Sequence, residues 1–244
     1  MKYFIKKLIN NSLFYIYPHF SIRYFLSRDI GYIVKHYKPH GKLLDVGCGE
    51  KPYKSIFQNT DYFGIDHKRY SRYKGKNTDQ KPDKYFDDKY TRDGILPFAN
   101  NLYDVVCSFQ VLEHVKNPSK LLKEMTRVLK PKGYMILTVP FIWGLHEEPK
   151  DYYRYTEYGI RSMIVKNKCK LIMIKKQGGV LSVIENSLMN YLVELNKKNF
   201  YYYLLTIPMY IPILLLSYVS VFIEHFVSSK TVFSNYLFLI QKTR

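Results

Sequence analysis

The sequence is poor in cysteine, with Cys48, Cys107 and Cys169 among 244 residues. The count is odd and no CxxC pair occurs, so we expect neither a disulfide framework nor a cysteine-based zinc site. This usage fits a reducing, cytoplasmic compartment. The basic, aromatic start of the chain has no clean apolar core and no small-residue cleavage site, so a secretory signal is not expected.

Negative charge is also scarce, because 38 Lys and Arg residues stand against 20 Asp and Glu, a formal net charge of +18. Such a surplus indicates an anionic partner, which can be a membrane surface, a nucleic acid or an acidic substrate. An AT-rich genome also favours lysine, so the charge alone does not choose among these partners.

The length favours one domain with added elements. Residues 1–40 have the spacing of amphipathic helices, which either pack on the domain or form a lid or membrane-surface helix. Residues 41–179 and 231–244 alternate strands with helices, typical of a mainly parallel sheet with covered faces. Residues 180–230 form a hydrophobic helical insertion.

Short apolar runs predict the strands, namely KLLDVG, YFGID, DVVCSF, GYMILTVP, KLIMIKK and SNYLFLIQK. The segment PSKLLKEMTRVLK has helical spacing, with Pro118 near its start and Pro131 after its end. The polar residues 68–94 predict an irregular segment with one short strand at most, near Tyr85 and Phe86.

A glycine turn, Gly47-Cys48-Gly49, ends the first predicted strand. Ligands of parallel sheets bind beyond the carboxyl ends of the strands, and glycine lets the backbone approach them closely. Asp66 ends the next strand, 17 residues after Gly49, where a carboxylate can accept hydrogen bonds from ribose hydroxyls. A purely structural pair of turn glycines is the alternative.

Two features argue against a dinucleotide at this turn. Pro52 stands where the third glycine of G-x-G-x-x-G would be, and Asp45 precedes the turn. The carboxylate would repel a pyrophosphate but suits a cationic amine. S-adenosylmethionine has that amine and a ribose but no phosphate, and is therefore the expected cofactor.

Five stretches occur in one order along the chain: LLDVGCGEKPY, YFGIDH, ILPFANNLYDVVCSFQVLEHV, LLKEMTRVLKPKGYMILTVP and HEEPKDYYRYT. Together they resemble the Rossmann-like (class I) S-adenosylmethionine-dependent methyltransferases, over about residues 40 to 180 and the last strand. The Pro-Tyr ending of the turn and the DYYRYT stretch are most similar to a branch found among bacterial surface-polysaccharide genes.

The resemblance implies an α/β fold, a seven-stranded Rossmann-like methyltransferase sheet with N-terminal helices and a hydrophobic helical insertion before the last strand. It implies that the turn lines the methionine end of the cofactor, that an acid after the third strand meets the adenine, and that the end of the fourth strand lies near the sulfonium. The expected cofactor-binding residues are Asp45, Gly47, Cys48, Gly49, Asp66, His67, Asp87, Phe109, Gln110 and His114. Asp88 is an alternative to Asp87, and His114 is expected to start a helix, with capping and packing as its other role.

Methyl transfer to a hydroxyl requires an aligned nucleophile and a base for its proton. His146 lies six residues beyond Pro140, where the fifth strand ends, and we predict that it is this base. Asp151 and Arg154 are the other catalytic candidates. The alternatives are a lid shaped by His146 and its neighbours, a structural Asp151–Arg154 pair at a helix start, and an Arg154 clamp on an anionic substrate. No metal is expected, because no second histidine stands near His146 in the sequence.

Between Lys198 and Glu224 lie 25 residues without formal charge, long enough to cross a bilayer. The tract lies between two strands of one sheet, so a single crossing would separate them. We expect a helical excursion, peripheral or monotopic, on an anionic membrane surface at the cytoplasmic face. A buried helical pair or a dimer interface is the alternative.

The sequence therefore predicts a methyltransferase that O-methylates a sugar or a lipid-linked glycan intermediate at the membrane. An RNA or small-molecule methyltransferase is one alternative, and a cofactor-binding module without catalysis is another. No nucleic-acid partner is expected, because neither an Asn-Pro-Pro-Tyr-type motif nor a known RNA-binding module occurs.

Overall fold

A computed structural model of the chain describes residues 19–68, 80–86, 95–166, 168–198, 200–227 and 229–243. Residues 1–18 of the expected N-terminal helical segment, together with Asp87 and Asp88, lie outside these residues. The described chain divides into two compact units. The first comprises residues 19–28, 142–144 and 176–235, and the second comprises the remaining described residues.

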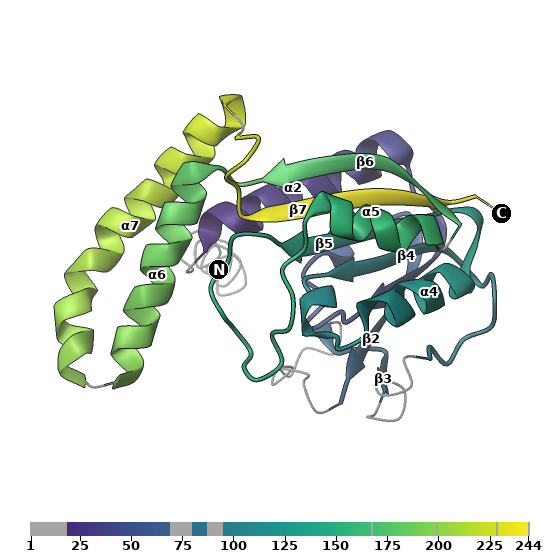
Figure 1. Cartoon of the computed structure of the whole chain (residues 1–244), viewed down its shortest axis with the longest axis horizontal. Coiled ribbons are helices and arrows are strands. Elements are labelled where there is room, and N and C mark those ends of the chain that lie inside the picture. The colour runs from purple at the N-terminus through teal and green to yellow at the C-terminus, as the bar shows by residue number, and fades with distance from the viewer. Residues whose placement is uncertain are drawn as a thin grey trace, which may run out of the picture. The chain divides into compact units, whose positions relative to one another are not determined.

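A single sheet runs in the order β3-β2-β1-β4-β5-β7-β6 (Figure 1). Its strands are β1 (Gly41–Val46), β2 (Thr60–His67), β3 (Lys84–Phe86), β4 (Tyr103–Phe109), β5 (Leu129–Pro140), β6 (Cys169–Gln177) and β7 (Asn235–Lys242). The first five strands pair in parallel, β1 with β2 and β4, β2 with β3, and β4 with β5. Their carboxyl ends therefore share one edge of the sheet, and the predicted seven-stranded methyltransferase fold is confirmed.

The helices are α2 (Phe20–Tyr37), α4 (Pro118–Val128), α5 (Glu157–Lys166), α6 (Val180–Lys198) and α7 (Phe200–Phe226), with single turns η1 (Lys54–Ile56) and η3 (Leu112–His114). The start of α4 follows from its sequence. Pro118 occupies the first turn, where its missing N–H is not needed, and the Asn117 side chain accepts a hydrogen bond from the backbone N–H of Lys120.

The core of the second unit lies between α2 and the central strands. Ile30 and Ile33 of α2 belong to one buried cluster with Leu43 of β1, Val105 of β4 and Ile136 of β5. Strands covered on both faces need continuous apolar runs rather than alternating ones. This explains why the runs in the sequence predicted the strands well.

Three local expectations differ from the structure. His114 ends the single turn η3 and does not start a helix, because α4 begins only at Pro118. Strand β5 begins at Leu129, ahead of Pro131, with a register shift against β4 that accommodates the extra residues. Asp151 and Arg154 lie in an extended segment before α5, which begins at Glu157, and not on a helix start.

Helices α6 and α7 of the first unit form a hairpin inserted between β6 and β7 (Figure 1). Asn196 near the end of α6 bonds to Thr206 and Tyr210 near the start of α7, while Ser182 near the start of α6 bonds to Glu224 near the end of α7. The chain therefore returns to the sheet after the hydrophobic tract. Within α7, residues Pro208–Phe226 are long and apolar enough to cross a membrane.

Candidate active site

The glycine turn joins the carboxyl ends of β1 and β2. The backbone N–H groups of Gly47 and Cys48 both donate to the carbonyl oxygen of Ile65, at 2.9 and 3.0 Å. Gly47 and Gly49 have φ values of 77° and 51°, which favour glycine. A Cβ on Gly47 would overlap the side chain of Val111, whereas a Cβ on Gly49 would meet nothing within 4 Å. Gly47 is therefore needed for packing, and Gly49 borders an open space that a ligand can enter.

Asp45, one residue before the end of β1, is 1% exposed. The Tyr62 hydroxyl donates a hydrogen bond to its Oδ2, while its buried Oδ1 has no hydrogen-bond partner in the described chain. Burial, with a smaller contribution from the nearby Asp66, raises the pKa of Asp45 to about 7. An unsatisfied buried carboxylate oxygen fits a ligand that brings a cationic amine to it.

Asp66 lies near the carboxyl end of β2, as predicted. Its carboxylate accepts a hydrogen bond from the backbone N–H of His67 at 2.7 Å, and the N–H of Gly49 acts on it in the same way. Burial nevertheless raises the pKa of Asp66. The backbone N–H groups of His67, at the end of β2, and of Gly49, in the glycine turn, therefore both act on the Asp66 carboxylate. The His67 ring is buried and packs edge-on against Phe86 of β3.

An ion pair beside the turn was missed by the sequence analysis. The ammonium of Lys51, which is 6% exposed, donates to Oδ1 of Asp83 at 2.7 Å, and the backbone N–H of Gly64 donates to Oδ2 at the same distance. Asp83 directly precedes β3, so the pair fastens the edge of the sheet to the glycine turn. Cys48 packs within this bracket, where burial raises the pKa of its thiol.

Phe109 and Gln110 lie at the carboxyl end of β4, as predicted. Phe109 is buried and meets the Tyr53 ring edge-on at 4.9 Å. Gln110 has a φ of 56°, and its backbone N–H donates to the carbonyl oxygen of Thr138 on β5 at 3.0 Å. Its side-chain Nε2 is buried without a hydrogen-bond partner in the described chain. A strained backbone beside an unsatisfied donor is typical of a ligand site.

His114 and His146 come together at this edge, because each follows one of two neighbouring strands, β4 and β5. Their ring centroids are 4.7 Å apart, with planes at 81°. The ring Nδ1 of His114 lies 2.8 Å from the carbonyl oxygen of Lys150. No second histidine lies near His146 in the sequence, but the structure brings His114 beside it, so the reason given for expecting no metal does not hold in space.

The carboxylate of Asp151 interacts with the side chains of both His146 and Arg154. The two terminal nitrogens of Arg154 donate to the two oxygens of Asp151 at 2.5 and 2.7 Å, and Nδ1 of His146 lies 3.2 Å from Oδ2. Burial alone would raise the pKa of Asp151, but the hydrogen bonds from Arg154 and from the backbone of His146 lower it to about 2. The pair thus has the structural role given as one alternative, and its carboxylate orients His146.

The tyrosine run after Asp151 packs on η3. The backbone N–H of Tyr152 donates to the carbonyl oxygen of Glu113, and the buried Tyr155 hydroxyl donates to that of Leu112 at 2.8 Å. Glu113 itself was not predicted as a site residue. Its side chain is fully buried, and burial raises its pKa to about 8.

A family model described as a methyltransferase domain matches residues 19–166, more than half of the chain. The chain belongs to this methyltransferase family. Over 132 residues the methyltransferase is 26% identical to an uncharacterised methyltransferase of Schizosaccharomyces pombe, covering 50% of this chain and 48% of that protein. Over 119 residues it is 29% identical to cycloartenol-C-24-methyltransferase 1 of Oryza sativa subsp. japonica, covering 47% and 34%. It spans about half the length of the first curated relatives it matches.

The fold of the methyltransferase also resembles solved structures. A protein assigned as a sarcosine dimethylglycine methyltransferase from Galdieria sulphuraria superimposes with a TM-score of 0.56, at 13% identity, over 88% of this chain and 85% of that one. Family and fold together give a class I methyltransferase whose cofactor is S-adenosylmethionine. The residues that would hold the cofactor include Gly49, which borders open space, Asp66, whose carboxylate accepts a hydrogen bond from the N–H of Gly49, and Asp45, which has an unsatisfied buried oxygen in the described chain.

Proposed function

We propose that the methyltransferase transfers a methyl group to a hydroxyl of a sugar or a lipid-linked glycan intermediate, while attached to the cytoplasmic face of a membrane through α6 and α7. The observation that carries the proposal is the exposure of large apolar side chains on this helical hairpin. Several of its polar side chains are buried, together with a small apolar cluster of Met189, Leu192 and Ile213.

The inner side of the hairpin is hydrogen-bonded. The Ser182 hydroxyl donates to Glu224 at 2.6 Å, and its backbone N–H donates to the other carboxylate oxygen at 3.1 Å. The Asn196 amide donates to the Tyr210 hydroxyl at 2.9 Å and accepts from the Thr206 hydroxyl at 2.7 Å. A helix pair that meets water normally turns such groups outward.

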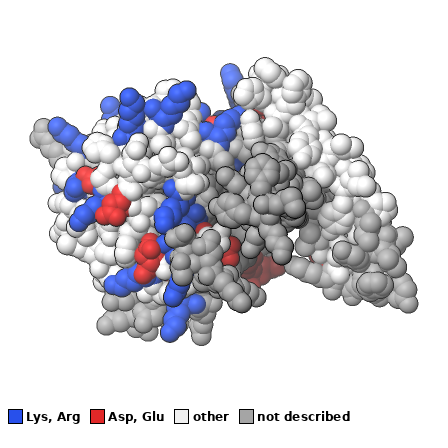
Figure 2. Space-filling view, turned by 180° about the vertical axis from the view of Figure 1, so that it is seen from behind, with Lys and Arg blue, Asp and Glu red and all other residues white. Residues whose placement is uncertain are grey.

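The outer side of α7 is a stripe of exposed apolar side chains spaced one or two turns apart. Ile211 is 67% exposed, Leu215 60%, Phe222 70% and Phe226 73%. A continuous apolar surface of this kind is unfavourable in water and favourable in the acyl region of a bilayer. Lys and Arg outnumber Asp and Glu on the face shown in Figure 2, and a chain with a net charge of +18 is attracted to anionic lipid headgroups.

Oxygen chemistry is supported by the surroundings of His146. When bound, S-adenosylmethionine supplies an activated methyl group on a sulfonium. His146 is held through Nδ1 by an ionised Asp151, so its Nε2 carries the lone pair that can accept the proton of an acceptor hydroxyl. A terminal nitrogen of Arg154 also lies 3.5 Å from Nδ1 of His146, so the role as base requires the tautomer in which Nδ1 carries the proton and donates it to Asp151.

Vesicle flotation tests the membrane attachment. We expect the wild type to float with vesicles that contain anionic lipid, and the triple variant Ile211→Ser, Leu215→Ser, Phe222→Ser to remain at the bottom. The matched control removes two exposed apolar side chains of the second unit, Ile95→Ser and Tyr158→Ser, and should float like the wild type. Equal flotation of the triple variant would contradict attachment through α7.

The acceptor is tested by labelled-methyl transfer to lipid extracts, glycan precursors and RNA in parallel, with Asp45→Ala as the blank. Label in the lipid or glycan fraction supports the proposal. Label in RNA alone favours the RNA methyltransferase that the net charge also permits, and cofactor binding without transfer to any of the three fractions contradicts the proposed acceptor class.

A further inference from the structure

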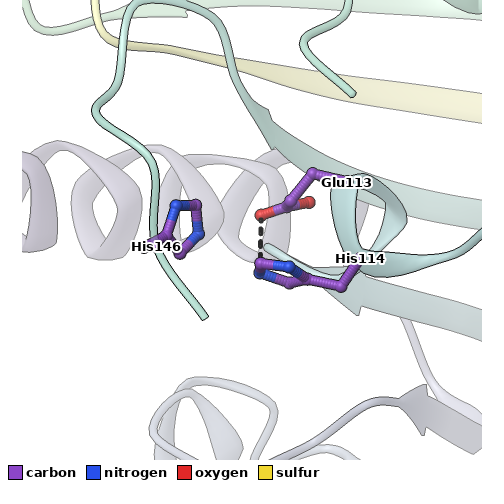
Figure 3. A group of neighbouring side chains, drawn as sticks. All are labelled: Glu113, His114 and His146. Atoms are coloured by element: carbon purple, nitrogen blue, oxygen red, sulfur yellow. Dashed lines mark ion pairs between the residues drawn. The ribbon is translucent and has the colours of Figure 1, made fainter. Parts of the chain in front are cut away.

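Glu113, His114 and His146 converge on one point at the carboxyl edge of the sheet (Figure 3). The first two come from η3 after β4, and the third comes from the segment after β5. Each side chain offers one donor atom, and the three atoms lie within 4.8 Å of one another. Nε2 of His114 lies 3.8 Å from Oε1 of Glu113. Donors about 2.0–2.2 Å from a tetrahedral ion lie roughly 3.3–3.6 Å from one another, so side-chain shifts of about 1 Å would close the site around an ion.

Both imidazole rings are oriented through the nitrogen that faces away from such an ion. Nδ1 of His114 bonds to the carbonyl oxygen of Lys150 at 2.8 Å. Nδ1 of His146 lies 3.2 Å from Asp151, to which it can donate, and 3.5 Å from a terminal nitrogen of Arg154. Protonation at Nδ1 leaves the lone pair on Nε2 of each ring. Metal-binding histidines are generally held by a carbonyl or carboxylate in this way.

Glu113 gives an independent reason to expect a cation. The side chain is fully buried, yet neither carboxylate oxygen accepts a hydrogen bond from another residue of the described chain. Of the charged groups acting on it, Asp151 and Glu147 are acidic and Arg154 is basic, and Arg154 is already paired with Asp151. Among the described residues, only the backbone N–H of Glu113 itself acts on this carboxyl as a donor, so its ionised form is costly unless a positive ligand satisfies it.

We infer that Glu113, His114 and His146 bind a divalent transition-metal ion. Two imidazole nitrogens and one carboxylate oxygen suit Zn²⁺, Mn²⁺ or Fe²⁺ better than Mg²⁺ or Ca²⁺, which prefer oxygen alone. Three protein donors leave a position for a small oxygen ligand. On the proposed function, that ligand would be the acceptor hydroxyl. The ion would lower its pKa so that its proton passes to solvent water, and His146 would then act as a metal ligand and not as the base.

Metal binding is measured without acceptor or membrane, so its outcome is independent of the transfer and flotation assays. The metal-stripped protein is titrated with Co²⁺ by visible absorption and with Zn²⁺ by competition against a chromophoric chelator. We expect one ion per chain. His114→Ala, His146→Ala and Glu113→Gln should each weaken binding at least tenfold, whereas His36→Ala, an exposed histidine on α2, should not change it.

Thermal melting establishes that each variant is folded. The conservative Glu113→Gln keeps the volume of the buried side chain and is the decisive variant if an alanine variant fails to fold. Stoichiometric binding that survives Glu113→Gln and both histidine variants would overturn the inference. So would the absence of binding by the wild type, or a cobalt spectrum dominated by thiolate charge transfer.

Discussion

The Tyr62 hydroxyl donates a hydrogen bond to one carboxylate oxygen of Asp45 and leaves the other oxygen buried without a partner in the described chain. The hydrogen bond from Tyr62 holds the Asp45 side chain in place in the ligand-free protein, but it satisfies only one of the two carboxylate oxygens. The remaining oxygen is thus available to a cofactor that carries a positive charge.

The affinity for the cofactor should become weaker as the pH falls below about 7. Burial raises the pKa of Asp45 to about 7, and a cationic amine is attracted to the ionised carboxylate, so each pH unit below that value weakens binding by up to about tenfold. Calorimetry with S-adenosylmethionine between about pH 6 and about pH 8 measures the slope. Asp45→Asn should bind weakly with a flat profile, and an unchanged slope in that variant would assign the titration to another group.

The free energy of unfolding of the cofactor-free protein should decrease as the pH rises from about 4 to about 8. The pKa values of Asp45 and Glu113 are raised to about 7 and about 8, so the folded state binds protons more tightly than the unfolded state in this window. Urea unfolding at several pH values tests this trend. The double variant Asp45→Asn, Glu113→Gln should flatten it, whereas a slope that persists would contradict these two shifts as its origin.

Alanine substitutions at the two turn glycines should have different effects, one on stability and the other on cofactor binding. Gly47→Ala overlaps Val111 at positive φ, so we expect a lower melting temperature. Gly49→Ala adds a methyl group to the open space, so beyond the strain of about 1–2 kcal/mol we expect weaker cofactor binding. Gly31→Ala on α2, where a Cβ meets nothing, is the control and should stabilise by roughly 0.5–1 kcal/mol. Full cofactor affinity in Gly49→Ala would argue against a ligand at the turn.

The contribution of the Asp151–Arg154 pair to stability should be present above about pH 4 and lost as the pH falls toward 2. The pKa of Asp151 in the folded protein is about 2, below its unfolded value of about 3.9, so stability disappears as the carboxylate takes up its proton. Asp151→Asn should destabilise the protein by roughly 1–3 kcal/mol and reduce methyl transfer, because it also releases His146. Unaltered transfer in Asp151→Asn would contradict its role in orienting His146.

Two tyrosines of one run should differ in their sensitivity to loss of the hydroxyl. Tyr155 is 7% exposed and donates to Leu112, whereas Tyr153 is 41% exposed and donates to Lys116. Tyr155→Phe leaves a buried carbonyl oxygen without its donor and should cost about 1–2 kcal/mol by chemical denaturation, whereas Tyr153→Phe should cost less than about 0.5 kcal/mol. Equal costs would mean that burial does not set the strength of these bonds.

Sequence patterns predicted the fold because its determinants are local. Continuous apolar runs correspond to strands covered on both sides, and the spacing of Leu121, Leu122 and Met125 corresponds to the buried side of α4. Even the three-residue strand near Tyr85 was predicted. The element boundaries were less accurate, because capping by Asn117 and the register shift in β5 decide them, and neither appears in hydrophobic periodicity.

The site was predicted in part, because its remaining residues depend on contacts across the sheet. Asp45, Gly49 and Asp66 follow recognisable turn and strand signals. Glu113 carries no such signal, since an acid in a short loop is usually exposed. The contact of His114 with His146 was in principle accessible, because both follow the carboxyl ends of strands that the resemblance places side by side.

The α6–α7 hairpin departs from and returns to the same place in the sheet. The backbone N–H of Ser234 lies 3.0 Å from the carbonyl oxygen of Gln177 and 2.9 Å from that of Gly178, so the two ends of the insertion are fastened together at its base. An insertion closed in this way can be gained, lost or exchanged during evolution without altering strand order. On the proposed function, this insertion carries the attachment to the membrane, whereas the sheet carries the chemistry.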